Sequence, residues 1–172
     1  MKTLKILFLL GAVILSGFSR ESQRTEMVVK PIKFNGVIIM NPSGGVTECT
    51  PLGEPYPYIA HLRSGWLKGI QSHGGKLNTE LSTWEISGCS TNFTNGLNTS
   101  QITGVNTVAN GDSYSYTCIM TVNIFTNDVI LNVTVTSGIG RFEGVTGHMT
   151  LTGIHTESGI PINGEGFMSF PK

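Results

Sequence analysis

The sequence carries little charge and no excess of either sign. Of its 172 residues 13% are charged, and eleven Lys and Arg residues balance eleven Asp and Glu residues. A typical soluble domain carries about 25% charged residues, and nucleic-acid-binding domains usually present a basic patch. The balance therefore gives no basis for a nucleic-acid partner or for attraction to an anionic membrane surface. It also argues against a coiled coil or a long charged helix.

The sequence also lacks the motifs of common catalytic, metal and cofactor sites. It contains no nucleophile elbow, no His-Glu-x-x-His zinc motif and no phosphate-binding loop that opens a helix. None of its three cysteines is spaced as C-x₂-C, and none has a histidine a few residues away. We therefore predict no metal site, no cofactor and no assignable catalytic residue.

The chain has one long apolar run, and it lies at the N-terminus. Lys2 and Lys5 precede ten residues without a polar side chain, from Ile6 to Leu15, and small residues follow up to Ser19. This order is typical of a secretory signal peptide, and the run is too short for a membrane span, which needs about 20 residues. We predict a signal peptide at residues 1–19 and an exported single domain at residues 20–172 with no permanent membrane anchor.

Cysteine pairing is possible in an exported protein, but the number of cysteines is odd. Of Cys49, Cys89 and Cys118, at least one must stay free or pair between chains. Our hypothesis is a bridge between Cys89 and Cys118.

The second half of the chain alternates apolar and polar residues with the period of a half-buried strand. This pattern predicts strands over 113–124, 129–136 and 145–153, with a turn at 126–128, and a last strand over 162–170. The residues predicted to face inward in the first three strands are Tyr114, Tyr116, Cys118, Met120, Val122, Ile124, Val129, Leu131, Val133, Val135, Val145, Gly147, Met149, Leu151 and Gly153.

The first half is less regular. Residues 28–40 are extended and β-branched, and residues 41–57 contain so many prolines and glycines that we predict a long loop. Beyond it, 58–72 and 76–87 predict a second hairpin, in which a change of phase between Leu77 and Trp84 indicates a bulge near Ser82.

Between this hairpin and the second half, residues 101–109 predict one more short strand, and residues 91–100 predict a polar loop. The abundant Thr, Ser and Asn residues suit strands and turns better than helix interiors. The fold class is therefore all-β, with about eight strands in an antiparallel meander barrel or, as the alternative, a β-sandwich. We favour the barrel because closure removes exposed strand edges.

One glycine-rich segment is more specific than the rest of the chain. Residues 137–147 read SGIGRFEGVTG. The segment resembles the G-T-G-x-F-x-x-x-x-G signature of the allene oxide cyclase and dirigent barrel group. It is closest to the G-G-T-G-R-F-E-G-A-T-G form of small secreted bacterial proteins of that group. The Ala-Asn-Gly-Asp turn at 109–112 and the Ser-His-Gly-Gly-Lys turn at 72–76 agree with the resemblance, which covers about residues 60–170.

The sequence departs from this signature at Ile139, where the family has Thr, and at Gly74, where it has Leu. The motif has a structural explanation, since glycines permit positive φ and close turns, and an aromatic side chain can plug a barrel. We assign this structural role to Gly138, Gly140, Phe142, Gly144 and Gly147. The cyclases use a glutamate inside the barrel, but no residue here matches it, so no catalytic residue is carried over.

Four histidines and a few charged residues are the other candidates. His61 and Arg63 form a His-x-Arg pair that would suit an anion, but we favour the simpler explanation that they lie on the outward polar face of a half-exposed strand. His73 lies in a glycine-rich turn and is expected to be structural. Because His148 and His155 are seven residues apart, they should lie on opposite strand faces and form no metal pair. Arg141 and Glu143 are expected to form an exposed ion pair.

Three functions fit these observations. The first is a secreted, non-catalytic barrel whose apolar interior either is fully packed or holds a small hydrophobic ligand, with lining residues Trp66, Tyr114, Tyr116, Met120 and Met149. The second is a cyclase, an isomerase or a dirigent-like guide that acts on a reactive apolar intermediate, as the resemblance implies. The third is a cell-surface interaction module that uses Tyr56 and Tyr58 in the 41–57 loop.

Overall fold

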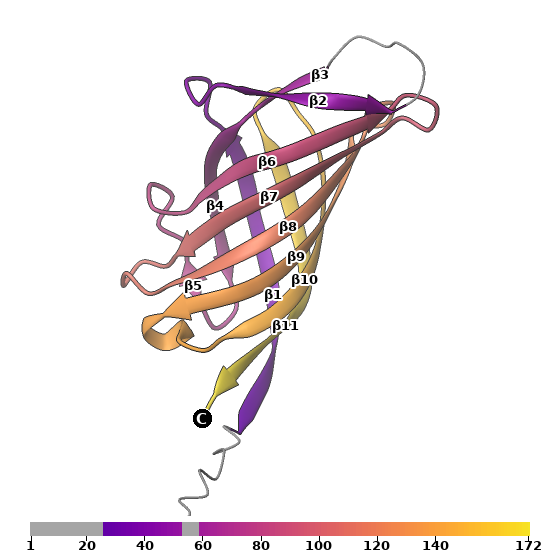
Figure 1. Ribbon diagram of the computed structural model, residues 1–172. Coiled ribbons are helices and arrows are strands. Elements are labelled where there is room, and N and C mark those ends of the chain that lie inside the picture. Colours follow the sequence, from indigo (N-terminus) through magenta and orange to yellow (C-terminus); the bar gives the residue numbers. More distant parts are fainter. Residues whose placement is uncertain (1–25, 53–58) are drawn as a thin grey trace, which may run out of the picture.

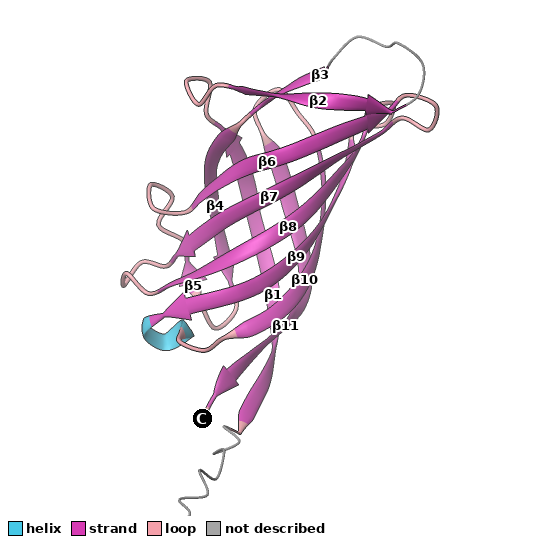
Figure 2. Cartoon of the chain, in the orientation of Figure 1, coloured by secondary structure: helices cyan, strands magenta, loops and turns pink. Residues whose placement is uncertain are grey.

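The computed structural model describes residues 26–52 and 59–172, and almost all of them lie in strands or in the short turns between strands (Figure 1; Figure 2). The predicted signal peptide and the tyrosines of the predicted interaction loop, Tyr56 and Tyr58, lie outside these residues. Within them the only helical segment is a single 3-10 turn, η1 (Gly140–Phe142). The expected all-β class is therefore confirmed.

Eleven strands follow one another within residues 26–52 and 59–172. They are β1 (Met27–Met40), β2 (Val46–Leu52), β3 (Ile59–Leu62), β4 (Ser64–Gln71), β5 (Gly75–Lys76), β6 (Thr83–Asn92), β7 (Leu97–Thr107), β8 (Ser113–Asn123), β9 (Asp128–Ile139), β10 (Thr146–Ile154) and β11 (Ile160–Pro171).

The strand pairings close into a ring. Strands β6, β7, β8, β9, β10, β11, β1 and β4 are hydrogen-bonded in that order, and a further pairing between β4 and β6 joins the first strand to the last. Each pairing in this ring is antiparallel. The ring has two ends: Figure 1 shows β2 and β3 across one of them, while the start of β1 and the end of β11 project from the other.

The inward face of the ring forms the core. Along β8 the side chains alternate between buried Tyr114, Tyr116, Cys118, Met120 and Val122 and their more exposed neighbours. Strands β9 and β10 continue the pattern, and the buried side chains of these and the other ring strands form one cluster. The inward set predicted for 113–123, 129–135 and 145–151 is therefore confirmed, because a period of two places alternate residues on one face of a strand.

The first half differs from the sequence-based prediction. Residues 46–52 lie in the predicted loop but form β2, which pairs with β3 and, in parallel, with β6. The predicted strand 58–72 is divided at Arg63 into β3 and β4. These pairings connect segments far apart in the sequence, so local proline and glycine content does not reveal them.

The predicted strand 76–87 is also interrupted. Only Gly75–Lys76 pairs with β4, and the chain then turns at Asn78, whose side-chain oxygen accepts a hydrogen bond from the Glu80 backbone N–H. Strand β6 begins after this turn, and its bulge lies between Ile86 and Gly88, not near Ser82. The turn, which leaves Leu81 exposed, accounts for the change of phase.

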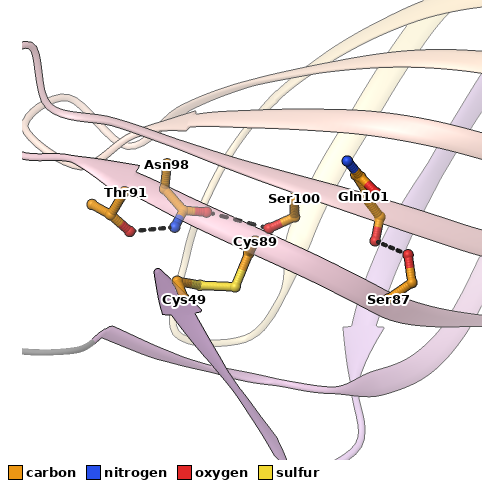
Figure 3. Close-up of a disulfide and its surroundings, with 7 residues drawn as sticks. All are labelled: Cys49, Ser87, Cys89, Thr91, Asn98, Ser100 and Gln101. Carbon is orange, nitrogen blue, oxygen red and sulfur yellow. Dashed lines mark hydrogen bonds between the residues drawn. A yellow bond between two sulfur atoms is a disulfide. The ribbon is translucent and has the colours of Figure 1, made fainter. Parts of the chain in front are cut away.

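The predicted polar loop 91–100 belongs instead to β6 and β7, which meet in a tight turn. Three of its polar side chains point inward and are buried: Thr91, Asn98 and Ser100. Asn98 donates to Thr91 Oγ1 at 2.7 Å, and Ser100 donates to Asn98 Oδ1 at 3.3 Å (Figure 3). Because these groups satisfy one another, the polar residues can occupy an interior face.

Candidate functional site

The ring surrounds a cavity of about 460 Å³ that has mostly apolar walls and is partly open to solvent. Every strand of the ring and β3 contribute to it. The lining residues are Phe34, Ile38, Met40, Ala60, His61, Leu62, Leu67, Trp84, Ile86, Ile102, Asn106, Tyr116, Cys118, Met120, Val122, Leu131, Val133, Met149, Leu151, His155, Thr156, Glu157, Ile160 and Ile162. This volume lies within the range of about 300–1,000 Å³ that is typical of small-molecule sites.

Three of the five predicted lining residues, Tyr116, Met120 and Met149, are in the cavity wall. The prediction was wrong for Trp66, because Gly65 and Leu67 take the inward positions of β4 and the alternation turns Trp66 outward. Trp66 lies instead along a groove on the outer face, together with Thr83 and other residues of β6 to β9. Trp84, which the sequence analysis did not single out, is the tryptophan that lines the cavity.

Tyr114 is also absent from the wall, although it points inward. It is 1% exposed and packs edge-on against Phe142, with ring centroids 5.2 Å apart. Its hydroxyl donates to Gln71 Oε1 at 2.5 Å and accepts from Asn106 Nδ2 at 2.9 Å. Tyr114 and Phe142 thus close the end of the ring that lies opposite β3.

The glycine-rich motif builds this closed end. Phe142 is 1% exposed, as expected for a plug, and η1 places it there. Gly140 has a φ of +63°, in the region that favours glycine. Gly138 was expected to have a positive φ, but it does not. A side chain is excluded there because the Phe142 carbonyl oxygen lies too close. Gly144 and Gly147 follow in the turn into β10 and in its first residues.

The two histidines and the carboxylate among the lining residues gather at the β3 end of the cavity. His61 comes from β3, and His155 and Glu157 come from the turn between β10 and β11. His155 was predicted to lie on the opposite strand face from His148. It follows directly after the end of β10 and lines the cavity, whereas His148 is exposed.

Burial and the nearby His155 lower the pKa of His61 below its usual value of 6.5. His61 Nε2 is buried and has no hydrogen-bond partner among the described residues. The neutral imidazole is therefore favoured in the folded protein, since a proton would place a poorly solvated charge beside a second histidine.

This shift predicts how acid affects stability. Below pH 6.5 the unfolded chain takes up a proton at His61 that the folded chain resists, so the free energy of unfolding should fall as the pH drops from 6.5 to the lower folded pKa. Above pH 6.5 His61 contributes nothing to the pH dependence. In urea titrations between pH 5 and 7.5, the free energy of unfolding of His61→Gln should depend less steeply on pH than that of the parent protein. The exposed His148→Gln is the matched control, and an equal change in both variants would contradict the assignment.

One disulfide fixes β2 over the ring. Cys49 of β2 is bonded to Cys89 of β6, 40 residues away in the sequence (Figure 3). The predicted pairing of Cys89 with Cys118 is therefore wrong. Cys118 faces the cavity, where it is buried and free, whereas Cys89 lies beneath β2. Because β3 pairs with β2, the bond also holds in place a strand that lines the cavity.

Burial raises the pKa of the Cys118 thiol to about 12. The thiolate is the reactive form, so Cys118 should react with Ellman's reagent at pH 8 only after unfolding. Without reductant, one thiol per chain should then be titrated in denaturant, and three after reduction. Three thiols without reductant, or fast labelling of the native protein, would contradict the assignment.

The remaining polar candidates lie apart from the cavity and from one another. Arg63 pairs with Glu85 at 2.8 Å on the outside of the ring, so it does not act with His61. Arg141 was expected to pair with Glu143, but the 3-10 turn directs it to Asp112 at 3.4 Å and to the Gly74 carbonyl at 2.5 Å. His148 is exposed and contacts Thr134.

His73 has a φ of +60° in the turn after β4, which agrees with a structural role. Within residues 26–52 and 59–172, no group of three or more His, Cys, Asp or Glu side chains is arranged to bind a metal ion. In the same part of the chain, no helix has the length and apolar character needed to cross a membrane.

A scan against protein-family models and a search of curated proteins both give no match to this chain. The cavity, its polar β3 end and its closed opposite end therefore carry the functional argument.

Proposed function

We propose that the protein is an exported β-barrel that binds one small apolar ligand inside the barrel. The observation that carries this proposal is the cavity of about 460 Å³ surrounded by the eight-stranded ring. Protein interiors are normally packed to crystal-like density, so a ligand-sized space with apolar walls is best explained by a molecule that fills it.

Two further observations support the proposal. The disulfide between Cys49 and Cys89 is compatible with an oxidising compartment outside the cytoplasm, in line with the predicted signal peptide. The segment 137–147, which resembles the allene oxide cyclase and dirigent group, forms the closed end of the ring, where a barrel of this kind would need a plug.

The two tryptophans make the proposal testable by fluorescence. Trp84 lines the cavity and Trp66 does not, although Trp84 also borders the outer groove, so the Trp66→Phe variant keeps only the tryptophan of the cavity wall. Titration with apolar probes, such as long-chain alcohols and fatty acids, should change its emission saturably at one ligand per chain. The matched variant Trp84→Phe, which keeps only the outer tryptophan, should show little change. A linear, unsaturable response in both variants would reject the proposal.

A second candidate is a cyclase, an isomerase or a dirigent-like guide that acts on a reactive apolar intermediate. The observation in its favour is the presence of His61, His155 and Glu157 at one end of an apolar cavity, because such groups transfer protons and an enclosing wall restricts the geometry of a reaction. It predicts that the protein changes the stereochemical ratio of products from an apolar epoxide. An unchanged ratio at saturating protein would exclude it.

A further inference from the structure

Asn106 is a buried amide in the cavity wall with one hydrogen-bonding atom unused. Its side chain is 3% exposed, and its Nδ2 donates to the Tyr114 hydroxyl at 2.9 Å. That hydroxyl donates its own proton to Gln71 Oε1 at 2.5 Å. In this arrangement Asn106 Oδ1 and Gln71 Nε2 are both left without a partner among the described residues, and of these two residues only Asn106 lines the cavity.

An unpartnered acceptor in this position requires an explanation. More than about 90% of buried polar groups in proteins are hydrogen-bonded, and the surrounding wall is formed by apolar side chains such as Ile102 and Leu67. A hydrogen-bond donor on a bound ligand would supply the missing partner. An apolar molecule without a donor would leave Asn106 Oδ1 unsatisfied and would bind less tightly.

The charges around the cavity disfavour an anionic head group. Among the described residues that line the cavity none is Lys or Arg, and the β3 end contributes Glu157, His155 and His61, of which His61 is favoured in its neutral form. A carboxylate would meet the negative Glu157 at that end and an unpartnered acceptor, Asn106 Oδ1, in the wall. The site therefore suits a molecule that can donate a hydrogen bond without carrying negative charge.

We propose that the ligand is an uncharged apolar molecule with a hydroxyl group, and that this hydroxyl donates a hydrogen bond to Asn106 Oδ1. The inference rests on the proposed function, since it names the chemical class of the ligand that the cavity holds. Tyr114 and Gln71 act as positioning residues, because they orient the amide and do not line the cavity.

A pair of isomers tests the proposal on the unmodified site. Dodecan-1-ol and methyl undecyl ether contain the same atoms, but only the alcohol can donate. In the Trp66→Phe background the alcohol should bind about tenfold more tightly than the ether, as expected for one additional buried hydrogen bond. Dodecanoate at pH 7.5 should bind more weakly than the alcohol.

Variants of Asn106 assign the effect to one atom. Asn106→Leu should abolish the preference for the alcohol while leaving the affinity for the ether within about twofold. A structural defect would instead weaken the binding of both ligands alike. Asn106→Asp, which keeps an acceptor, should retain the preference. Asn132→Leu, the same change at an exposed position of β9 outside the cavity, is the matched control and should also retain it.

The outcomes separate this inference from the proposed function. If alcohol and ether bind equally to the protein with Asn106, or if dodecanoate binds more tightly than the alcohol, the inference is wrong and the binding function stands. If Asn106→Leu keeps the preference, Asn106 is not the acceptor. If none of the three ligands binds saturably, the proposed function itself fails.

Discussion

Replacing both Cys49 and Cys89 with alanine should lower the free energy of unfolding by about 3–4 kcal/mol, the loss that loop-closure entropy predicts for a bond of this span. The bond joins residues 40 apart in the sequence. Beyond it, the described strand pairing between β2 and the ring consists of three parallel residue pairs, 50–52 with 90–92. Strand β3 pairs with β2, so the two strands should loosen together.

Hydrogen exchange followed by mass spectrometry should locate the effect. Amides of residues 46–52 and 59–62 should exchange faster in the double variant, while those of β8 and β9 should keep their relative protection. Cys118→Ala, which changes a cysteine in the cavity wall without breaking a bond, is the control. A double variant as stable as the parent, with unchanged exchange in β2, would show that the disulfide does not anchor this strand.

Phe142→Ala should destabilise the protein by about 3–5 kcal/mol, as is usual for removing a fully buried aromatic side chain. Phe142 is 1% exposed and contacts the rings of Tyr114 and Phe170, with centroids at 5.2 and 6.2 Å. Its loss would leave a void at the end of the ring opposite β3 and would remove support from the Tyr114 hydroxyl network. Chemical denaturation gives the change directly.

Phe125→Ala is the matched control for this prediction. Phe125 lies in the turn between β8 and β9 and is 69% exposed, so its replacement should change stability by less than about 0.5 kcal/mol. Equal effects of the two substitutions would contradict the role of Phe142 as the plug.

The second half of the fold could be predicted from the sequence because its strands pair with their neighbours along the chain. Strands β8, β9 and β10 are neighbours in sequence and in space, and their period of two marks the buried face. The first half depends on distant partners. Strand β2 pairs in parallel with β6 and is tied to it by the disulfide, and nothing in residues 46–52 themselves reveals that partner.

The cavity wall could likewise be predicted only where strands alternate regularly. Tyr116, Met120 and Met149 follow from the alternation in β8 and β10. Trp66 was misplaced because its orientation depends on which residues of β4 face inward, and Gly65, an inward position, has no side chain to mark the pattern. Asn106 and His61 were not predicted as wall residues, since a polar side chain on an inward face looks the same in sequence as one on the surface.

Diffraction from crystals pressurised with xenon tests the central claim, an apolar cavity able to receive a ligand, most directly. Empty apolar cavities in proteins bind xenon. Electron density for xenon or for a retained ligand is expected inside the ring, between Tyr116, Met120 and Met149. A ring interior filled by its own side chains, with no xenon site among these residues, would contradict the claim.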